Sequence, residues 1–481
     1  MRFALAASLI ALFASTAVQA AEAKPNILFL LSDDHSYPYL GCYGCADVST
    51  PTLDKLAADG LRCDRMFVAC PQCVPSRATL MTGRSPVSVK MVRFTSPLPA
   101  DVVALPDLLR DQAGYFTGVA GRSYHLDGPA TEGRRAAKEI GGTLDKHDLR
   151  TFQRRVDYVD GGGPGESGGR MTKFLDAAPK DKPWFFWLGF SDPHHPWSTT
   201  AAGSTEADIK AKASKLTLPP HLPDLPGVLE DLARYLAEIE HLDAEIDAVL
   251  KVLAERGAAE NTLVVFMGDN GMAMPHGKGA LTDPGINVPL IVRWPGVVKR
   301  GRTTRELISG EDFAPTMLAA AGVKPPKTMT GVSFLPLLRD ENYDGRKFIF
   351  AERGPHGGDG GMKHDILASA FDLARCARSA DFKLIYNCTP HQAVAPVDSQ
   401  QDPGWQAILA AHQAGSLPEA IEKAYFTLPR ATFELYDLNA DPGELNNLAG
   451  DPKYREVELE LKRALTEKMV LDWDFLPTPL R

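Results

Sequence analysis

The sequence predicts an α/β fold, in which strands and helices alternate along the chain. Short apolar runs of strand length alternate with longer stretches of helical periodicity, the pattern of a sheet with helices packed on it. The chain has 481 residues, more than one hydrophobic core usually serves. Hydrophobic residues make up 44% and charged residues 23%, as in ordinary globular proteins. We therefore expect two packed domains with an α/β core.

The first residues predict a secretory signal peptide. Met1 and Arg2 precede an apolar run over residues 3–13, and Val18-Gln19-Ala20 offers small residues at which signal peptidase cuts. The apolar run is shorter than the ~20 residues that a membrane-spanning helix needs. We therefore expect residues 1–20 to be a signal peptide, and the protein to be exported to the periplasm or secreted without a membrane anchor.

The elements follow in order from apolar runs and helical spacing. Strands are predicted at 26–31, 116–120, 184–190, 262–267 and 289–293, helices at 53–60, 75–81 and 228–256, and loops at 160–170 and 216–227. The helix over 228–256 has the clearest signal, because Leu, Ile and Val recur at helical spacing and Gly257 follows as a C-cap. Pro75 fits a first helical turn, which places residue 73 near the positive end of that helix.

A polar cluster follows each of four predicted strands. The clusters are Ser32–His35, Gly121–His125, Ser191–His195 and Gly268–Gly271. Open α/β sheets bind ligands beyond the carboxyl ends of their strands. We therefore predict that these four clusters converge on one site.

Hard oxygen ligands are concentrated in two of these clusters. Asp33, Asp34 and Asp269 would repel one another unless a cation held them together, and Asn270 adds an amide oxygen. An all-oxygen set suits calcium or magnesium better than zinc. A single Asp at a strand end is more often a turn or capping residue, so the prediction of a metal site rests on the whole set.

A short motif identifies the expected chemistry. Cys73-Val74-Pro75-Ser76-Arg77, followed by Leu80-Met81-Thr82-Gly83-Arg84, resembles the signature of the type I sulfatases. The resemblance implies the alkaline-phosphatase-like fold, with a large mixed, mostly parallel sheet flanked by helices and a smaller C-terminal antiparallel sheet. It implies that Cys73 is oxidised to formylglycine, whose hydrate is the nucleophile. It also implies one calcium ion, bound by Asp33, Asp34, Asp269, Asn270 and residue 73.

The resemblance also assigns roles to the cationic residues. Arg77 lies one helical turn after residue 73 and is expected to hold its oxygen, and Lys278 is similar to the lysine that contacts both sulfate and nucleophile in the family. Arg122 stands where the family usually has lysine. Because Arg is planar and multidentate, either it contacts sulfate in another geometry or the alignment is offset.

Two histidines are candidates for proton transfer, since the imidazole pKa lies close to working pH. The resemblance implies that His125 acts as a base in hemiacetal collapse and that His194 protonates the leaving oxygen. His195 competes with His194 for that role. Without the motif, each histidine would be read as a satisfied core residue as readily as a catalytic one.

The C-terminal region resembles the small sheet subdomain of sulfatases. Residues 348–352 are similar to a last strand of the large sheet, and residues 381–386 and 434–438 to strands of the small sheet. We expect a catalytic domain over 21–355 and a C-terminal α+β subdomain over 356–481. Candidate substrate contacts are Arg353, His356, His364 and Arg375, with Trp197 as a platform for a sugar ring.

The cysteines leave alternatives open. Cys70 and Cys73 form a C-x-x-C pair, which is also found in redox and zinc sites, but zinc needs two more close ligands. If Cys73 is converted, six of the seven cysteines remain, an even number that permits disulfides in an oxidising compartment.

The sequence therefore predicts a calcium-dependent sulfatase that hydrolyses a sulfate ester on a sulfated carbohydrate. Its expected partners are this substrate and a formylglycine-generating enzyme, and the net charge of −9 argues against nucleic acid. The alternatives are a sulfamidase acting on an N-sulfated sugar, because the Asp-Pro-His context is similar to heparan N-sulfatase, and a formylglycine-dependent phosphonate or phosphodiester hydrolase. A carbohydrate-binding pseudoenzyme with an unmodified Cys73 is the non-enzymatic alternative.

Overall fold

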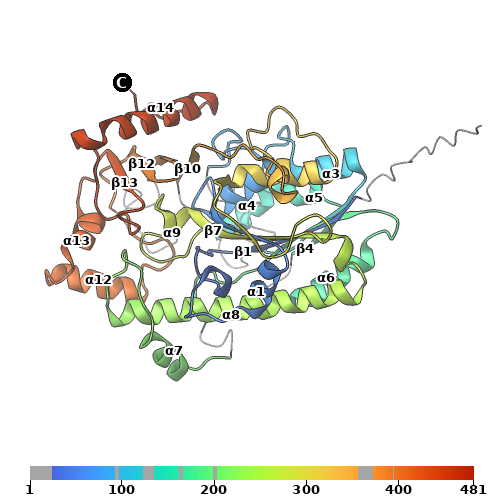
Figure 1. Ribbon diagram of the computed structural model, residues 1–481, viewed down its shortest axis with the longest axis horizontal. Helices are drawn as coiled ribbons and strands as arrows, with labels where there is room; N and C mark the ends of the chain where they lie inside the picture. Colours follow the sequence, from blue (N-terminus) through green and yellow to red (C-terminus); the bar gives the residue numbers. More distant parts are fainter. Residues whose placement is uncertain are drawn as a thin grey trace, which may run out of the picture.

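A sheet of nine strands forms the centre of the protein, and a second sheet of four strands lies beside it (Figure 1). The computed structural model describes residues 24–92, 97–122, 135–161, 166–198, 203–355, 372–393 and 395–480. The predicted signal peptide lies outside these residues. The two sheets with their helices confirm the predicted α/β fold.

The large sheet is mixed and mostly parallel. Its strand order is β4-β3-β5-β1-β6-β7-β2-β8, with β9 also paired to β2. Within the sheet, β7 alone runs against its neighbours, β6 and β2. The strands are β1 (Asn26–Ser32), β2 (Leu61–Phe67), β3 (Phe116–Gly121), β4 (Tyr158–Asp160), β5 (Trp184–Gly189), β6 (Thr262–Gly268), β7 (Asn287–Arg293), β8 (Arg302–Thr304) and β9 (Ile308–Ser309).

Helices cover both faces of the large sheet, which explains why its central strands are apolar along their whole length. In β1, Ile27, Phe29 and Leu31 pack into one core, while Leu28 and Leu30 pack into the core on the opposite face. The first core includes residues of α2 (Cys73–Thr82), α3 (Leu105–Ala113) and α10 (Phe313–Ala320). The second includes residues of α1 (Pro51–Ala58), α6 (Ser167–Ala177), α8 (Pro226–Glu255), α12 (Pro403–Gln413) and α13 (Glu419–Phe426).

The helix α8 runs along the second face of the sheet (Figure 1). It has 30 residues, a length of about 45 Å at 1.5 Å per residue. Its apolar stripe, including Leu232, Leu236, Ile239 and Val249, is buried in the second core. Within the described part of the chain, no helix is both long enough and apolar enough to cross a membrane. The remaining helices are α4 (Arg135–Lys146), α5 (Thr151–Arg155), α7 (Glu206–Ala213), α9 (Asp283–Ile286), α11 (Leu335–Leu338) and α14 (Arg455–Leu471).

Most predicted elements are confirmed with small shifts at their ends. The predicted strands at 26–31, 116–120, 184–190, 262–267 and 289–293 correspond to β1, β3, β5, β6 and β7. The first helix begins earlier than predicted, at Pro51, because proline fits its first turn. The prediction of a loop over 160–170 is wrong at its C-terminal end, since α6 begins at Ser167. Two glycines at positions 168 and 169 obscured this helix, and one of them packs closely against Ala248 of α8.

The small sheet is antiparallel, with the order β10-β11-β12-β13. Its strands are β10 (Ile349–Arg353), β11 (Ala374–Arg378), β12 (Phe382–Asn387) and β13 (Phe433–Asp437). The strands predicted at 381–386 and 434–438 are therefore confirmed. The assignment of 348–352 to the large sheet is wrong, because β10 pairs with β11 in register from Ile349 opposite Arg378 to Arg353 opposite Ala374.

The small sheet packs on both of its faces. Residues Ala377, Leu384 and Leu435 face α14, while Cys376 and Ile385 join the first core of the large sheet. Polar contacts also tie α14 to the catalytic body, since Lys468 lies 2.9 Å from Glu311 and Ser85 donates to Asp472 at 2.7 Å. The small sheet is thus fixed against the elements that carry the candidate site.

Candidate active site

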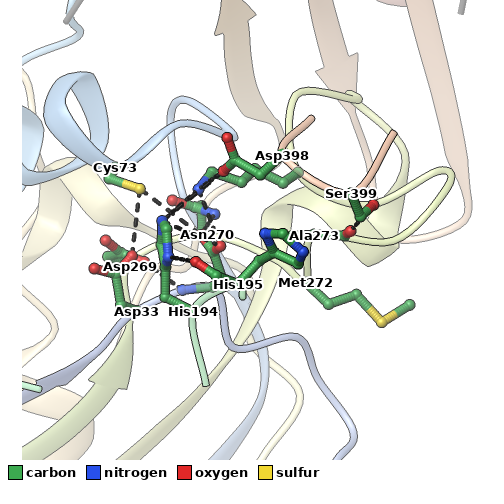
Figure 2. A network of polar contacts seen from close by, with 12 residues as sticks. Asp33, Cys73, His194, His195, Asp269, Asn270, Met272, Ala273, Asp398 and Ser399 are labelled. Atoms are coloured by element: carbon green, nitrogen blue, oxygen red, sulfur yellow. Dashed lines mark hydrogen bonds and ion pairs between the residues drawn. The ribbon is translucent and has the colours of Figure 1, made fainter. Parts of the chain in front are cut away.

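The described residues of the four polar clusters lie at one edge of the large sheet. The strands that precede them, β3, β5, β1 and β6, are consecutive neighbours and run parallel. Their carboxyl ends therefore meet, as the sequence predicted. Asp33 and Asp34 follow β1, Asp269 and Asn270 follow β6, and His194 follows β5 (Figure 2).

Three carboxylates lie together at the bottom of the site. Asp33, Asp34 and Asp269 are fully buried, and the backbone N–H of Asp34 donates to Asp269 Oδ1 at 2.9 Å. Asp34 has a φ of 62°, a left-handed conformation that Asp adopts more readily than most residues. Tyr235 of α8 fixes this turn, because its hydroxyl donates to the carbonyl oxygen of Asp34 at 3.2 Å and accepts from the N–H of Ser36 at 3.0 Å.

Cys73 points at these carboxylates from the first position of α2 (Figure 2). Its Sγ lies 3.3 Å from Asp33 Oδ1 and 3.7 Å from Asp34 Oδ1. Burial, followed by the negative charge of Asp33, raises the pKa of the thiol well above its usual value. The encoded thiol is therefore protonated at neutral pH and is a poor nucleophile as it stands.

Arg77 bridges the carboxylates one turn further along α2. Its Nη2 lies 2.9 Å from Asp33 Oδ2, its Nε donates to Asp269 Oδ2 at 2.9 Å, and its Nη1 donates to the carbonyl oxygen of Arg122 at 2.7 Å. Burial alone would lower the pKa of Arg77, but the charges of Asp33 and Asp269 outweigh burial and raise it. Arg77 thus stays charged inside the protein.

Lys278 reaches Asp34 from the loop after β6. Its Nζ donates to Asp34 Oδ2 at 2.9 Å and to Asp398 Oδ2 at 2.7 Å, and lies 3.1 Å from His194 Nε2. The loop needs glycine on both sides of the lysine. A Cβ on Gly277 would lie 2.1 Å from the carbonyl oxygen of Met272, and Gly279 has a φ of 82°.

The structure separates the two neighbouring histidines. His194 Nε2 faces Lys278 and lies 3.7 Å from Asp34 Oδ2, whereas His195 Nε2 lies 2.8 Å from Asp402. The Nδ1 of His194 is hydrogen-bonded to the carbonyl oxygen of His195, so the Nε2 lone pair faces Lys278. Burial, with the charges of Lys278 and Arg122, lowers the pKa of His194 well below its usual value. His194 is therefore the neutral histidine within the cluster.

Arg122 reaches the same carboxylates from the end of β3. Its Nε lies 2.6 Å from Asp33 Oδ2, and its side chain is 13% exposed. The tight turn there depends on Gly121, because a Cβ at that position would lie 2.0 Å from the carbonyl oxygen of Gly189. Arg122 thus brings a further positive charge to Asp33. His125, predicted in the same segment, lies outside the described residues.

The residues present fit a hard cation. Burial, with the charge of Asp33, raises the pKa of Asp34 to about 6 and that of Asp269 to about 7, although Lys278 and Arg77 oppose the rise, so clustering and burial outweigh the neighbouring cations. Asn270 Oδ1 is buried and has no hydrogen-bond partner among the described residues. Ligand atoms of Asp33, Asp34, Cys73 and His194 lie within 4.8 Å of one another. The carboxylate oxygens of Asp33 and Asp34 in this group, together with the amide oxygen of Asn270, are ligands that calcium and magnesium prefer.

The residues suggested as substrate contacts differ in their burial and in the groups that they contact. Arg375 is buried and paired with Asp474, a structural role that leaves it no route to a substrate. Arg353 lies beside Gly279 and is paired with Asp372. Trp197 is half-buried, and its ring meets that of His195 edge-on at 5.3 Å. His356 and His364 lie outside the described residues.

Sequence reasoning missed an acidic residue of the site, Asp398, and a second acid beside it, Asp402. Asp398 and Asp402 lie on the segment between β12 and α12, and they contact Lys278 and His195 respectively. They have no local motif, and their contacts span 120 or more residues of chain. Two acids four residues apart before a Pro-initiated helix would have been interpreted as helix capping.

The cysteines show no disulfide, and all seven are free in the structure. Cys70 is buried and its Sγ lies 3.5 Å from Gln72 Oε1. Among the described residues, the cluster of possible metal ligands contains Cys73 but not Cys70. The geometry therefore does not support a zinc or redox pair at Cys70 and Cys73.

Two family models match the chain. The model described as Sulfatase matches residues 25–323, and the model described as N-sulphoglucosamine sulphohydrolase, C-terminal, matches residues 276–425. The first match contains every catalytic and metal-binding residue that the sequence predicted. The second contains Lys278 and Asp398.

Individual proteins are similar over nearly the whole chain. An ulvan-active sulfatase of Formosa agariphila is 28% identical, covering 92% of this chain and 74% of that protein. The human N-sulphoglucosamine sulphohydrolase is 27% identical, and the alignment covers 92% of this chain and 89% of that protein. Among solved structures, the phosphonate monoester hydrolase of Silicibacter pomeroyi aligns with a TM-score of 0.66 at 21% identity. The alignment covers 94% of this chain and 96% of that protein, which shows a shared fold.

Proposed function

The chain belongs to the sulfatase family, which makes it a sulfuric ester hydrolase, and we propose that it removes sulfate from a sulfated carbohydrate. We further propose that it uses formylglycine at position 73 and one calcium ion. Sugar substrates are supported by relatives named for ulvan and for N-sulphoglucosamine. The observation that carries the proposal is the position of residue 73, whose Sγ lies 3.3 Å from Asp33 and 3.7 Å from Asp34. These two carboxylates are paired with Arg77, Arg122 and Lys278.

The calcium ion would be held by Asp33, Asp34, Asp269, Asn270 and residue 73, and when bound it supplies the positive charge that keeps these carboxylates ionised. Formylglycine would supply a hydrated aldehyde oxygen as nucleophile where the thiol cannot. Both proposals rest on the acidic, buried environment of Cys73.

The cations of the site would bind the sulfate group. Lys278 Nζ is paired with Asp34 and the Arg122 guanidinium with Asp33, while Arg77 holds Asp33 and Asp269 in place. Charge that develops on the sulfonyl oxygens would be stabilised by donors that the fold has already oriented. Because these cations are anchored by buried carboxylates, they need little reorganisation when substrate binds.

A proton for the leaving oxygen would come from the Lys278–His194 pair. The neutral His194 accepts from the Lys278 ammonium at 3.1 Å, so it has no proton of its own on Nε2. Against the effect of burial, the charges of Asp34 and Asp398 raise the pKa of Lys278. The ammonium would therefore release a proton only as charge develops on the leaving oxygen, with the proton passing through His194 Nε2 to that oxygen. We propose that His194, rather than His195, performs this step.

An experiment on residue 73 tests the proposal. Active protein should contain a peptide in which residue 73 has lost one sulfur and two hydrogens and gained one oxygen, and Cys73→Ala should abolish hydrolysis of an aryl sulfate while keeping the fold. Cys70→Ala, a buried cysteine of the same segment, is the matched control and should keep both the modification and turnover. Full activity with an unmodified Cys73 would contradict the proposal.

A second candidate substrate is an N-sulfated sugar. The match of residues 276–425 to the C-terminal region of N-sulphoglucosamine sulphohydrolase favours it. Comparison of N-sulfated glucosamine with 6-O-sulfated N-acetylglucosamine would separate the two substrates. An aryl phosphonate monoester tests the phosphonate hydrolase alternative, and absence of turnover on all of these would favour the binding protein.

Three further expectations accompany the proposal. We propose export on the basis of the predicted signal peptide, and a formylglycine-generating enzyme that would modify Cys73 during synthesis. The division near residue 355 remains a proposal. Because β10 pairs in the small sheet, the C-terminal unit would begin before Ile349.

A further inference from the structure

Asp398 is an acidic residue placed where an anionic substrate group is expected. Its Oδ2 accepts from Lys278 Nζ at 2.7 Å and lies 3.8 Å from His194 Nε2 (Figure 2). Both partners belong to the proposed sulfate site. A carboxylate beside them weakens the binding of any anion, so its presence needs a physical reason.

The fold holds Asp398 in this position through contacts other than the ion pair. The neighbouring Ser399 hydroxyl is hydrogen-bonded to the carbonyl oxygen of Ala273, and Val397 Cγ2 lies where a Cβ on Gly279 would be only 2.6 Å away. The segment 395–399 is therefore clamped to the loop that carries Lys278. Asp402 and Gly404, which contact His195 and Asp231, anchor its other end.

The charges of the site are nearly balanced with Asp398 included. The described charged groups in mutual contact are the four carboxylates Asp33, Asp34, Asp269 and Asp398, and the three cations Arg77, Arg122 and Lys278, which leaves a net charge of −1. A bound divalent cation brings the total to +1. A sulfate ester carries one negative charge, so it makes the occupied site neutral, whereas a phosphate monoester carries two at pH 8.

We propose that Asp398 determines specificity for monoanionic ester groups, and so selects sulfate esters against phosphate monoesters of the same shape. This inference rests on the proposed sulfatase function and adds the charge state of the group that the site accepts. Size cannot make this distinction, because sulfate and phosphate groups are both tetrahedral and differ little in bond length. One fixed negative charge can make this distinction, because the electrostatic repulsion between that charge and the ligand doubles when the charge of the ligand doubles.

A pair of isosteric anions tests the proposal by binding alone. Benzenesulfonate carries one negative charge and phenylphosphonate carries two at pH 8.5, and neither is hydrolysed. Their dissociation constants would be measured by calorimetry on calcium-loaded wild-type protein and on Asp398→Asn. Asn suits this position, because Asp398 has a φ of 70° and Asn tolerates the left-handed region.

Asp398→Asn should tighten phenylphosphonate binding by roughly tenfold more than benzenesulfonate binding, since repulsion between charges a few ångströms apart scales with the ligand charge. Asp402→Asn is the matched control. It removes an acid from the same segment that pairs with His195 and not with Lys278, and it should leave the ratio of the two constants unchanged. If Asp398→Asn does not fold, Asp398→Gly, which also accepts the left-handed conformation, replaces it.

Three results would overturn the proposal. An equal gain for both anions would mean that Asp398 blocks the site without discriminating charge, and a loss for both would mean that it only positions Lys278. Failure of benzenesulfonate, the monoanion, to bind wild type would mean that these groups do not line an anion site. Wild-type hydrolysis of p-nitrophenyl sulfate is measured separately, so that a failure of the sulfatase function is distinguished from a failure of the charge selection.

Discussion

Glu352 offers a quantitative test of how burial controls the stability of this fold. Its side chain is only 8% exposed in β10, and burial raises the pKa of its carboxyl from 4.5 to about 8. Its Oε1 accepts from the backbone N–H of Val87, in the segment after α2, at 2.6 Å. The positive charge of Arg375 opposes this effect, but its Nε lies 3.9 Å away and pairs more closely with Asp474.

The sign of the pH dependence follows from this shift. Because the folded protein binds the Glu352 proton more tightly than the unfolded chain, its stabilising contribution is complete below pH 4.5 and is lost as pH rises toward 8. With 1.36 kcal/mol for each pKa unit, the wild type should lose about 3 kcal/mol of unfolding free energy from this group between pH 5 and pH 8. Glu352→Gln removes the titration and keeps an oxygen to accept from Val87.

The assay is urea unfolding of wild type and Glu352→Gln at several pH values from 5 to 8.5, with saturating calcium to hold the metal site constant. The stability of Glu352→Gln relative to wild type should rise by about 3 kcal/mol across this range. Glu255→Gln, at the exposed end of α8, is the control and should show no such trend. A difference between wild type and Glu352→Gln that stays constant with pH would refute the reasoning.

The other predictions concern the metal, the sulfate site and a buried ion pair. Asp269→Ala should lose stoichiometric calcium, measured by elemental analysis, together with turnover, and calcium retained in a folded variant would contradict the assignment. Arg122→Ala should strongly reduce kcat/KM for an aryl sulfate. Arg122→Lys should restore it only in part, because Lys cannot reproduce the planar contact to Asp33. Unchanged kinetics in Arg122→Ala would place this residue outside the site. Lys383→Met should destabilise the protein by about 3–5 kcal/mol in urea unfolding. The reason is that buried Glu444, whose Oε2 lies 2.9 Å from Lys383 Nζ, loses this partner. Adding Glu444→Gln should recover part of the lost stability.

The sequence predicted the elements and edge of the sheet that carry the site, for a local physical reason. A strand buried on both faces is apolar along its length, so β1, β5 and β6 could be recognised from composition alone. In a parallel sheet the polar residues that follow such strands must meet at one edge. Asp33 and Asp269 could therefore be placed together although they are far apart in the chain.

Other features depended on contacts that no local pattern encodes. Which of His194 and His195 faces Lys278 depends on how one turn after β5 is oriented, and both residues look alike in sequence. The sheet to which β10 belongs depends on its pairing with β11, because the residues of a short strand do not specify which strand it pairs with.

Asp398 shows most clearly what only the tertiary structure decided. Periodicity and capping signals act over a few residues, whereas Asp398 reaches Lys278 across 120 residues of chain. It does so because α12 packs on α8 and because Ser399 and Val397 fit against the loop around Gly279. Local sequence specifies helices, strands and their polar ends, but the charge balance of the site is set by side chains that only long-range packing brings together.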